Sequence, residues 1–259
     1  MAHHAAGVPQ TMNVVVFSGT TEGRALSYTL AELGAQVTVC VATEYGKIDQ
    51  GFCPGIQVKS GRLEQADMIP VLQDKTLCID ATHPYATQVT QNIREAAAQA
   101  GVVYKRLLRP ASQLPQGCLV AANAQEAVQV LQSTEGNILL TTGAKELLPF
   151  ASLGKERLYA RVLPLESSLH ACAQAGIQPA HIIAMQGPFG AELNKALLHQ
   201  YSIRYLVTKD GGSPGGFWEK WEASQACDVQ MVVIRRPEED GESYQDVLDF
   251  CKEWMAGCR

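Results

Sequence analysis

The sequence predicts an α/β protein made of two Rossmann-like domains, each built on a parallel sheet, with a cleft between the domains. Short apolar runs rich in β-branched residues alternate with helical patterns along most of the chain. These runs are continuously apolar rather than alternating, which is typical of strands covered on both faces. The repeated order of strand, loop and helix favours parallel sheets with helices on both sides. A chain of 259 residues is long enough for two such domains.

The first half of the chain begins with one βαβ unit. The run NVVVF at 13–17 predicts a strand, apolar residues at helical spacing predict a helix over 22–33 that Gly34 ends, and the run at 36–41 predicts the next strand. The other elements expected in this half are strands at 57–59, 76–80 and 102–105 and helices at 64–72 and 85–100.

A stretch containing proline, glutamine and glycine, which ends at Gly117, breaks the periodicity and marks the expected domain boundary. We expect residues 11–117 to form a nucleotide-binding domain and residues 118–259 to form a second Rossmann-like domain that contributes to the substrate cleft. The elements expected in the second domain are strands at 137–141, 157–162, 181–184, 204–208 and 230–234 and helices at 124–132, 167–175, 191–200, 217–227 and 243–255.

Composition excludes several classes of protein. Lys and Arg number 21 against 26 Asp and Glu, and this net charge of −5 argues against nucleic acid as a partner. No run of 18 apolar residues is present, so we expect no membrane span. The eight cysteines are scattered without a CxxC spacing, which argues against a metal site. The first ten residues lack the features of a signal peptide, so free thiols and a cytoplasmic location are expected, while the oligomeric state stays open.

The turn after the first strand, SGTTEGR, is suited to binding a phosphate. Its two glycines let a ligand approach the backbone, and N–H groups at a helix start favour an anion. The spacing is neither a full GxGxxG nor a P-loop, so a tight strand-to-helix turn without a ligand remains the alternative. The candidate residues in this turn are Gly19, Thr20, Thr21, Glu22, Gly23 and Arg24.

The ends of the next two buried strands carry further candidates. Thr43 precedes Glu44, and this pair does not decide between NAD and NADP, since a carboxylate suits the first coenzyme and a hydroxyl suits the second. The loop DATHPY at 80–85 offers His83 and Tyr85, two groups that can donate a proton. The alternative is structural, with Pro84 as the first helical residue and an Asp or Thr as its cap.

Polar and glycine-rich loops also follow the strands of the second half. The loop after 204–208 has four glycines in six residues, which can present N–H groups to a carboxylate or phosphate, or can be only a flexible connection. Tyr205 and Lys209 have the YxxxK spacing of short-chain dehydrogenases, but that chemistry needs a helix, and four residues of strand span about 13 Å. We therefore reject that match.

Several motifs together resemble those of the precorrin-6A reductase family, which includes cobalt-precorrin-6A reductase. They are VVVFSGTTEGRALS, IDATHPYA, RLLRP, LLTTGAKEL, ARVLP, IIAMQGPF, VTKDGGSPG and VVIRRP, in this order from about residue 13 to 237. The resemblance implies an oxidoreductase of cobalamin biosynthesis. Such an enzyme uses NADPH to reduce one CH–CH double bond of precorrin-6A, or of its cobalt form, and produces precorrin-6B. One departure is the loop Gly211–Gly216, which has more glycines than is usual in the family.

With this resemblance, each candidate group receives an expected role. His83 and Tyr85 become possible proton donors, and an acidic chain must concentrate its cations where the tetrapyrrole carboxylates bind. The residues expected to bind the coenzyme are Gly19, Thr20, Thr21, Glu22, Gly23, Arg24, Thr43, Asp80, Ala81, Thr82 and His83. Those expected to bind the substrate are Arg106, Arg109, Thr142, Gly143, Arg161, Gln186, Gly187, Lys209, Gly211, Gly212, Ser213 and Lys220. The alternative is a protein that binds a nucleotide or an anionic macrocycle without turning it over.

Overall fold

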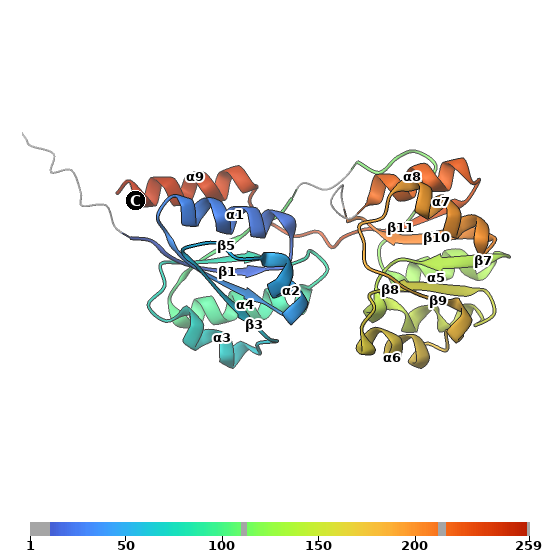
Figure 1. Ribbon diagram of the computed structural model, residues 1–259, viewed down its shortest axis with the longest axis horizontal. Helices are drawn as coiled ribbons and strands as arrows, with labels where there is room; N and C mark the ends of the chain where they lie inside the picture. Colours follow the sequence, from blue (N-terminus) through green and yellow to red (C-terminus); the bar gives the residue numbers. More distant parts are fainter. Residues whose placement is uncertain (1–10, 110–112, 212–215, 258–259) are drawn as a thin grey trace, which may run out of the picture. The chain divides into compact units, whose positions relative to one another are not determined.

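The computed structural model describes residues 11–109, 113–211 and 216–257, and these form two compact α/β units (Figure 1). The first unit combines the chain up to Pro110 with the segment from Glu238 onward, and the second unit is Ala111–Pro237. Each unit is built on its own parallel sheet, as the apolar runs predict. Among the helices of the described ranges, none has both the length and the apolar character that a membrane span requires.

The first unit is a five-stranded parallel sheet in the order β3-β2-β1-β4-β5. The order reverses between β1 and β4, and ligands of open parallel sheets bind beyond the carboxyl ends of the strands at this point. The strands are β1 (Asn13–Ser18), β2 (Gln36–Val41), β3 (Ile56–Ser60), β4 (Leu77–Ala81) and β5 (Val103–Arg106). The helices are α1 (Thr21–Glu32), α2 (Glu44–Gln50), α3 (Gln65–Leu72), α4 (Thr87–Ala100) and α9 (Tyr244–Met255).

Alternate residues of β1 face two separate cores, which explains why this strand is apolar throughout. Val14 and Val16 belong to a core with α1 and α9, whereas Val15 and Phe17 belong to a core with α3 and α4. Figure 1 shows the two helix layers on opposite faces of the sheet. A strand buried on both sides fixes the position of the turn that follows it, and that turn carries the SGTTEGR motif.

The second unit is a six-stranded parallel sheet in the order β6-β11-β10-β7-β8-β9, whose order reverses between β7 and β10. Helices α7 and α8 cover one face, and α5 and α6 lie on the other (Figure 1). The strands are β6 (Leu119–Ala121), β7 (Asn137–Leu140), β8 (Leu158–Val162), β9 (Ile182–Ala184), β10 (Ile203–Lys209) and β11 (Gln230–Ile234). The helices are α5 (Ala124–Gln132), α6 (Glu166–Gln174), α7 (Ala191–Gln200) and α8 (Phe217–Ala226), with short 3₁₀ turns at Ala144–Glu146, Leu148–Leu153 and Pro179–His181.

The last helix lies in a different unit from the one that the sequence predicts. The expected domains are continuous, 11–117 and 118–259, but α9 packs on the first unit. Its apolar residues Val247, Leu248 and Cys251 join the core of α1, and the hydroxyls of Tyr244 and Thr29 lie 2.8 Å apart. The apolar stripe of the helix specifies a buried face without specifying which sheet it covers.

Gly23 in the first turn of α1 allows close packing of this helix on β4. A Cβ added there would lie 2.5 Å from the Cβ of Ala81, too close for any real contact. Overpacking of this kind costs about 1–3 kcal/mol, which exceeds the gain of up to about 1 kcal/mol that alanine brings in a helix. We therefore expect Gly23→Ala to lower the free energy of unfolding, measured by urea denaturation.

Gly19→Ala is the matched control for this substitution. A Cβ on Gly19 would meet its nearest atom at an ordinary 3.4 Å, so its effect on stability should be small. Equal stability losses in the two variants would contradict the packing account.

Candidate functional site

The loops after β1 and β4 meet at the carboxyl edge of the first sheet. A Cβ on Gly19 would lie 3.4 Å from the amide nitrogen of His83 and 3.5 Å from the Cα of Thr82, so the two backbones nearly touch. Thr20 joins the loops, because its hydroxyl donates to the carbonyl of Ala81 at 3.0 Å and accepts from the amide of Gly23 at 3.2 Å. The structure thus brings together residues that the sequence separates by about 60 positions.

The start of α1 presents unused hydrogen-bond donors at this edge. The first amides of a helix have no acceptor within the helix. Within the described part of the chain, the amides of Thr20, Thr21 and Glu22 donate to no protein group. Together with the positive end of the helix dipole, such donors suit the pyrophosphate of a dinucleotide. The residues of this turn therefore fit the expected coenzyme.

Glu22 brings a negative charge to the same helix start. The Nε of Arg109 lies 3.5 Å from its Oε1, while its Oε2 is buried and has no partner in the described ranges. Because the guanidinium offsets the carboxylate, a phosphate near α1 meets less repulsion. Arg109, expected on substrate carboxylates, therefore lies beside the turn after β1 in the first unit.

A buried charge network supports the loop after β4. The Nη1 of Arg106 donates to the Oδ1 and carbonyl of Asp80, each at 3.1 Å, and to the carbonyl of Thr82 at 2.9 Å. Its Nε and Nη2 donate to the two carboxylate oxygens of Glu239 at 2.8 and 3.0 Å. Asp80 also accepts from the amide and hydroxyl of Thr82 at 3.0 and 2.7 Å and from the hydroxyl of Tyr104 at 3.0 Å. Burial, with the Asp80 charge, raises the pKa of Tyr104 and keeps this hydroxyl a donor.

This network shows how three of the expected site residues are used within the protein. Arg106 is 3% exposed, and its donors are engaged by Asp80, Thr82 and Glu239. Asp80 and Ala81 are fully buried and lie beneath the loop after β4. Thr82 remains at the edge with its hydroxyl held by Asp80.

His83 and Tyr85 form a half-buried pair above this network. Their rings stack with centroids 5.4 Å apart, and the Nδ1 of His83 accepts from the amide of Tyr85 at 3.4 Å. The helix expected from residue 85 begins at Thr87, because Pro84 lies in a turn that the amide of Ala86 closes on the carbonyl of His83 at 2.8 Å. The turn holds both rings outside the helix.

The end of β2 leads into α2, which the sequence analysis did not predict. Thr43 caps this helix, with its hydroxyl accepting from the amide of Gly46 at 3.0 Å. Glu44 accepts a hydrogen bond from Ser60. The Nη1 of Arg24 lies 3.9 Å from the Oδ1 of Asp49. The carboxylate that an NAD site would use is therefore engaged by the protein.

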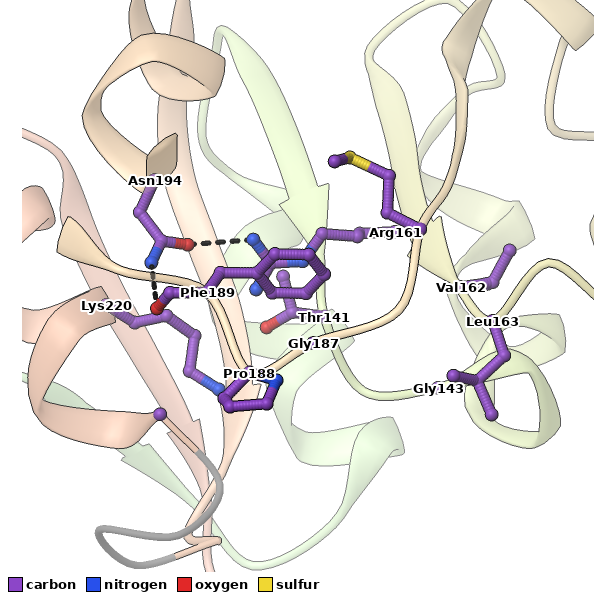
Figure 2. Close-up of a pocket in the computed structure, with 12 residues that line it drawn as sticks. Thr141, Gly143, Arg161, Val162, Leu163, Gly187, Pro188, Phe189, Asn194 and Lys220 are labelled. Carbon is purple, nitrogen blue, oxygen red and sulfur yellow. Dashed lines mark hydrogen bonds between the residues drawn. The ribbon is translucent and has the colours of Figure 1, made fainter. Parts of the chain in front are cut away.

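The second unit contains a pocket of about 380 Å³ at the carboxyl ends of β7, β8 and β9 (Figure 2). Arg161 of β8 is 7% exposed and lies against the Phe189 ring, with its guanidinium carbon 4.2 Å from the ring centroid. Its Nη1 donates to the Oδ1 of Asn194 at 2.7 Å. Asn194 in turn donates to the carbonyls of Phe189 and Gly190 at 3.3 and 2.9 Å, which fixes its amide.

Lys220 of α8 is a second buried cation of this pocket. Burial and the charge of Arg161 lower the pKa of Lys220 to about 8, although Glu219 acts in the opposite direction. Burial also lowers the pKa of Arg161 to about 10. Both shifts mean that the pocket destabilises the charged forms of Arg161 and Lys220. An anion bound between them would stabilise these charged forms.

Other expected substrate residues are spread around the same edge of the second sheet. Gly143 and Gly187 line the pocket, Thr142 is buried, and Gln186 is exposed. The Nζ of Lys209 lies 3.2 Å from the Oε1 of Glu146. Gly211 follows β10, whereas Gly212 and Ser213 lie outside the described residues. Two pocket residues, Phe189 and Asn194, are not among the residues expected from the sequence. Phe189 could have been predicted, because it ends the QGPF run that follows a strand. Asn194 lies within a helical pattern that gives no indication of a binding site. No cluster of three or more metal-ligating side chains occurs in the ranges that the structure describes.

Comparison with known proteins agrees with this arrangement. Residues 13–252 match the family model described as "Precorrin-6x reductase CbiJ/CobK". The chain belongs to the precorrin-6x reductase family. Among curated members, it is 36% identical over 231 residues to a cobalt-precorrin-6A reductase of Salmonella typhimurium, covering 87% of this chain and 88% of that protein. It is 34% identical over 236 residues to a cobalt-precorrin-6A reductase of Methanothermobacter thermautotrophicus, covering 88% and 78%.

The fold is also that of a solved structure, named "CobK precorrin-6A reductase". The match has a TM-score of 0.72 at 23% identity and covers 94% of this chain and 97% of that one. A likeness at this identity supports the two-sheet architecture. The family match supplies what the fold alone does not, a reductase class that implies a reduced nicotinamide coenzyme.

Arg106 should contribute strongly to the stability of the fold. Arg106→Gln leaves the buried Asp80 without its charge partner, and breaking a buried pair in this way costs about 3–5 kcal/mol. We expect a loss of this size in the free energy of unfolding, measured by denaturant titration. Arg109→Gln is the control, since its partly exposed pair with Glu22 should contribute about 0–1 kcal/mol. A stability of Arg106→Gln equal to that of Arg109→Gln would contradict the structural role.

Proposed function

We propose that this chain is a cytoplasmic NADPH-dependent reductase that converts precorrin-6A, or its cobalt form, to precorrin-6B in cobalamin biosynthesis. The observation that carries the proposal is the turn after β1. In a member of a reductase family, unused amides at the start of α1 lie beside the loop after β4 at the point where the strand order reverses. This is where parallel sheets bind dinucleotides.

The chain has few chemical tasks in this reaction. When bound, the reduced nicotinamide supplies a hydride to one carbon of the double bond, and a proton must reach the neighbouring carbon. The amides of Thr20, Thr21 and Glu22 bind the pyrophosphate. Thr82, held by Asp80, positions the loop that carries His83 and Tyr85. These two rings are the candidate proton donors.

Thr43 is the residue that we propose to favour NADPH over NADH. It follows β2 and caps α2, at the strand end where dinucleotide-binding sheets meet the ribose of the adenosine half. The neighbouring Glu44 is engaged by Ser60, so no free carboxylate takes the 2′-hydroxyl. Lys47 of α2 adds a positive charge one turn further on. A hydroxyl and an ammonium suit the charged 2′-phosphate.

The second unit is proposed to bind the tetrapyrrole. Its carboxyl edge gathers two buried cations and backbone groups of glycine-containing loops. The substrate carries several acetate and propionate carboxylates. An acidic chain therefore offers its positive charge where the substrate is negative.

A single-turnover assay under anaerobic conditions tests the proposed reaction. With precorrin-6A in excess, absorbance at 340 nm should fall as bound NADPH is oxidised. In the same assay, loss of a general acid lowers the rate by about 10²–10⁴-fold, so we expect such a drop for His83→Gln or Tyr85→Phe while NADPH affinity stays unchanged. Absence of NADPH oxidation by the wild type would refute the reductase, and full rates in both variants would assign the proton to solvent.

Thr43→Asp should weaken NADPH binding specifically. Aspartate caps a helix as well as threonine does, so α2 keeps its start. The added carboxylate repels the 2′-phosphate and can accept from a 2′-hydroxyl. Calorimetric titration should show at least a tenfold loss of NADPH affinity with NADH affinity kept or improved. Thr43→Ser is the control and should bind both coenzymes as the wild type does. Equal losses for both coenzymes in Thr43→Asp would contradict the assignment.

A further inference from the structure

The five cations that the sequence proposes for substrate carboxylates differ in their partners. Arg106, Arg109 and Lys209 each have a carboxylate of the chain within 4 Å. Arg161 has no carboxylate within that distance among the described residues, although it is 7% exposed. Buried charges in proteins are normally paired, because an isolated charge in a low-dielectric interior is costly. The described residues therefore provide no anion for the buried charge of Arg161, and a ligand would have to supply one.

The guanidinium of Arg161 is held in place with most of its donors available. Phe189 covers one face of the guanidinium, and Asn194 takes one N–H from its edge (Figure 2). The carbonyls of Phe189 and Gly190 fix the Asn194 amide, so the contact is rigid. A guanidinium has five N–H donors. The structure therefore holds the planar guanidinium in a fixed orientation, with N–H donors placed to bind a carboxylate.

Lys220 brings a second positive charge to the same pocket from helix α8, whereas Arg161 lies on strand β8. It lines the pocket with Arg161 and Asn194, and its surroundings depress its pKa through burial and the Arg161 charge. Glu219 lies next to it and has the opposite effect, smaller than that of Arg161. Two buried cations in one pocket repel each other unless an anion lies close to both.

The size of the pocket limits what can enter it. Its 380 Å³ lies near the lower end of the range of about 300–1,000 Å³ for sites that enclose drug-sized molecules. A whole tetrapyrrole is larger than such molecules. The walls include apolar side chains from Val162, Leu163, Met185, Pro188 and Phe189. A short arm fits this lining if its methylenes contact the apolar walls and its terminal anion lies near the two cations.

We propose that this pocket binds one carboxylate-bearing arm, an acetate or propionate, at the edge of the substrate macrocycle. The carboxylate accepts from Arg161 and Lys220, and the methylenes contact the apolar walls. The ring itself stays outside. This inference rests on the proposed function for the identity of the macrocycle, but the site needs only a carboxylate on a short arm. Arg161 and Lys220 would thus set the position of the ring before reduction.

Binding of a stable corrin polycarboxylate, cobyrinic acid, tests the site without turnover. Quenching of intrinsic fluorescence should show that the wild type binds the acid at least tenfold more tightly than its heptamethyl ester. Arg161→Gln and Lys220→Met should each weaken binding of the acid at least tenfold and leave the ester unchanged. Arg204→Gln removes an exposed cation of β10 and should behave as the wild type. Thermal denaturation checks that each variant is folded, and Arg161→Lys should restore part of the affinity.

Two further readouts separate this proposal from the proposed function. NADPH affinity should be unchanged in Arg161→Gln and Lys220→Met, and KM for precorrin-6A should rise while kcat changes little. If the wild type reduces precorrin-6A and both folded variants keep its KM and its preference for the acid, the carboxylate site is wrong and the reductase stands. If the wild type oxidises no NADPH with precorrin-6A, the proposed function fails whatever the binding data show.

Discussion

The buried guanidinium of Arg106 is the interaction on which the geometry of the first unit depends. It binds Asp80 at the end of β4 and Glu239 in the segment that returns from the second unit. Through Asp80 it also fixes Thr82, and so the loop that faces the first turn of α1. Each member satisfies the others, so the network is stable only when complete. The pair with Glu239 also holds the segment that leads into α9 against the first unit, where α9 packs on α1.

The two units share a strand arrangement but present different chemical groups at the carboxyl edge of the sheet. In both sheets, polar loops gather beyond the carboxyl ends of parallel strands where the strand order reverses. The first unit offers backbone amides at a helix start, which suit phosphate, a group that all nucleotides share. The second unit offers Arg161 and Lys220, buried side-chain cations that suit carboxylates at particular positions of one substrate. A chain with a net charge of −5 thus presents groups suited to anions in both units.

Local patterns of the sequence predicted the elements well, and contacts between distant residues account for the errors. The β1–α1–β2 unit was expected within two residues of its observed bounds, because a continuous β-branched run and Gly34 mark its limits. Helix α2 was missed because its seven residues, EYGKIDQ, include a glycine and have no apolar stripe. The structural partners of Arg106 could not be predicted from the sequence, since Glu239 lies 133 residues away. A charged residue at a strand end has the same sequence pattern whether it binds a ligand or the chain itself.

The turn between β1 and α1 is proposed to bind the pyrophosphate of the coenzyme. A crystal structure grown with NADP⁺ in excess tests this most directly. The pyrophosphate oxygens should lie about 2.7–3.2 Å from the amides of Thr20, Thr21 and Glu22, the usual range for such hydrogen bonds. Coenzyme bound at another place, or a turn that stays empty at saturating NADP⁺, would contradict it.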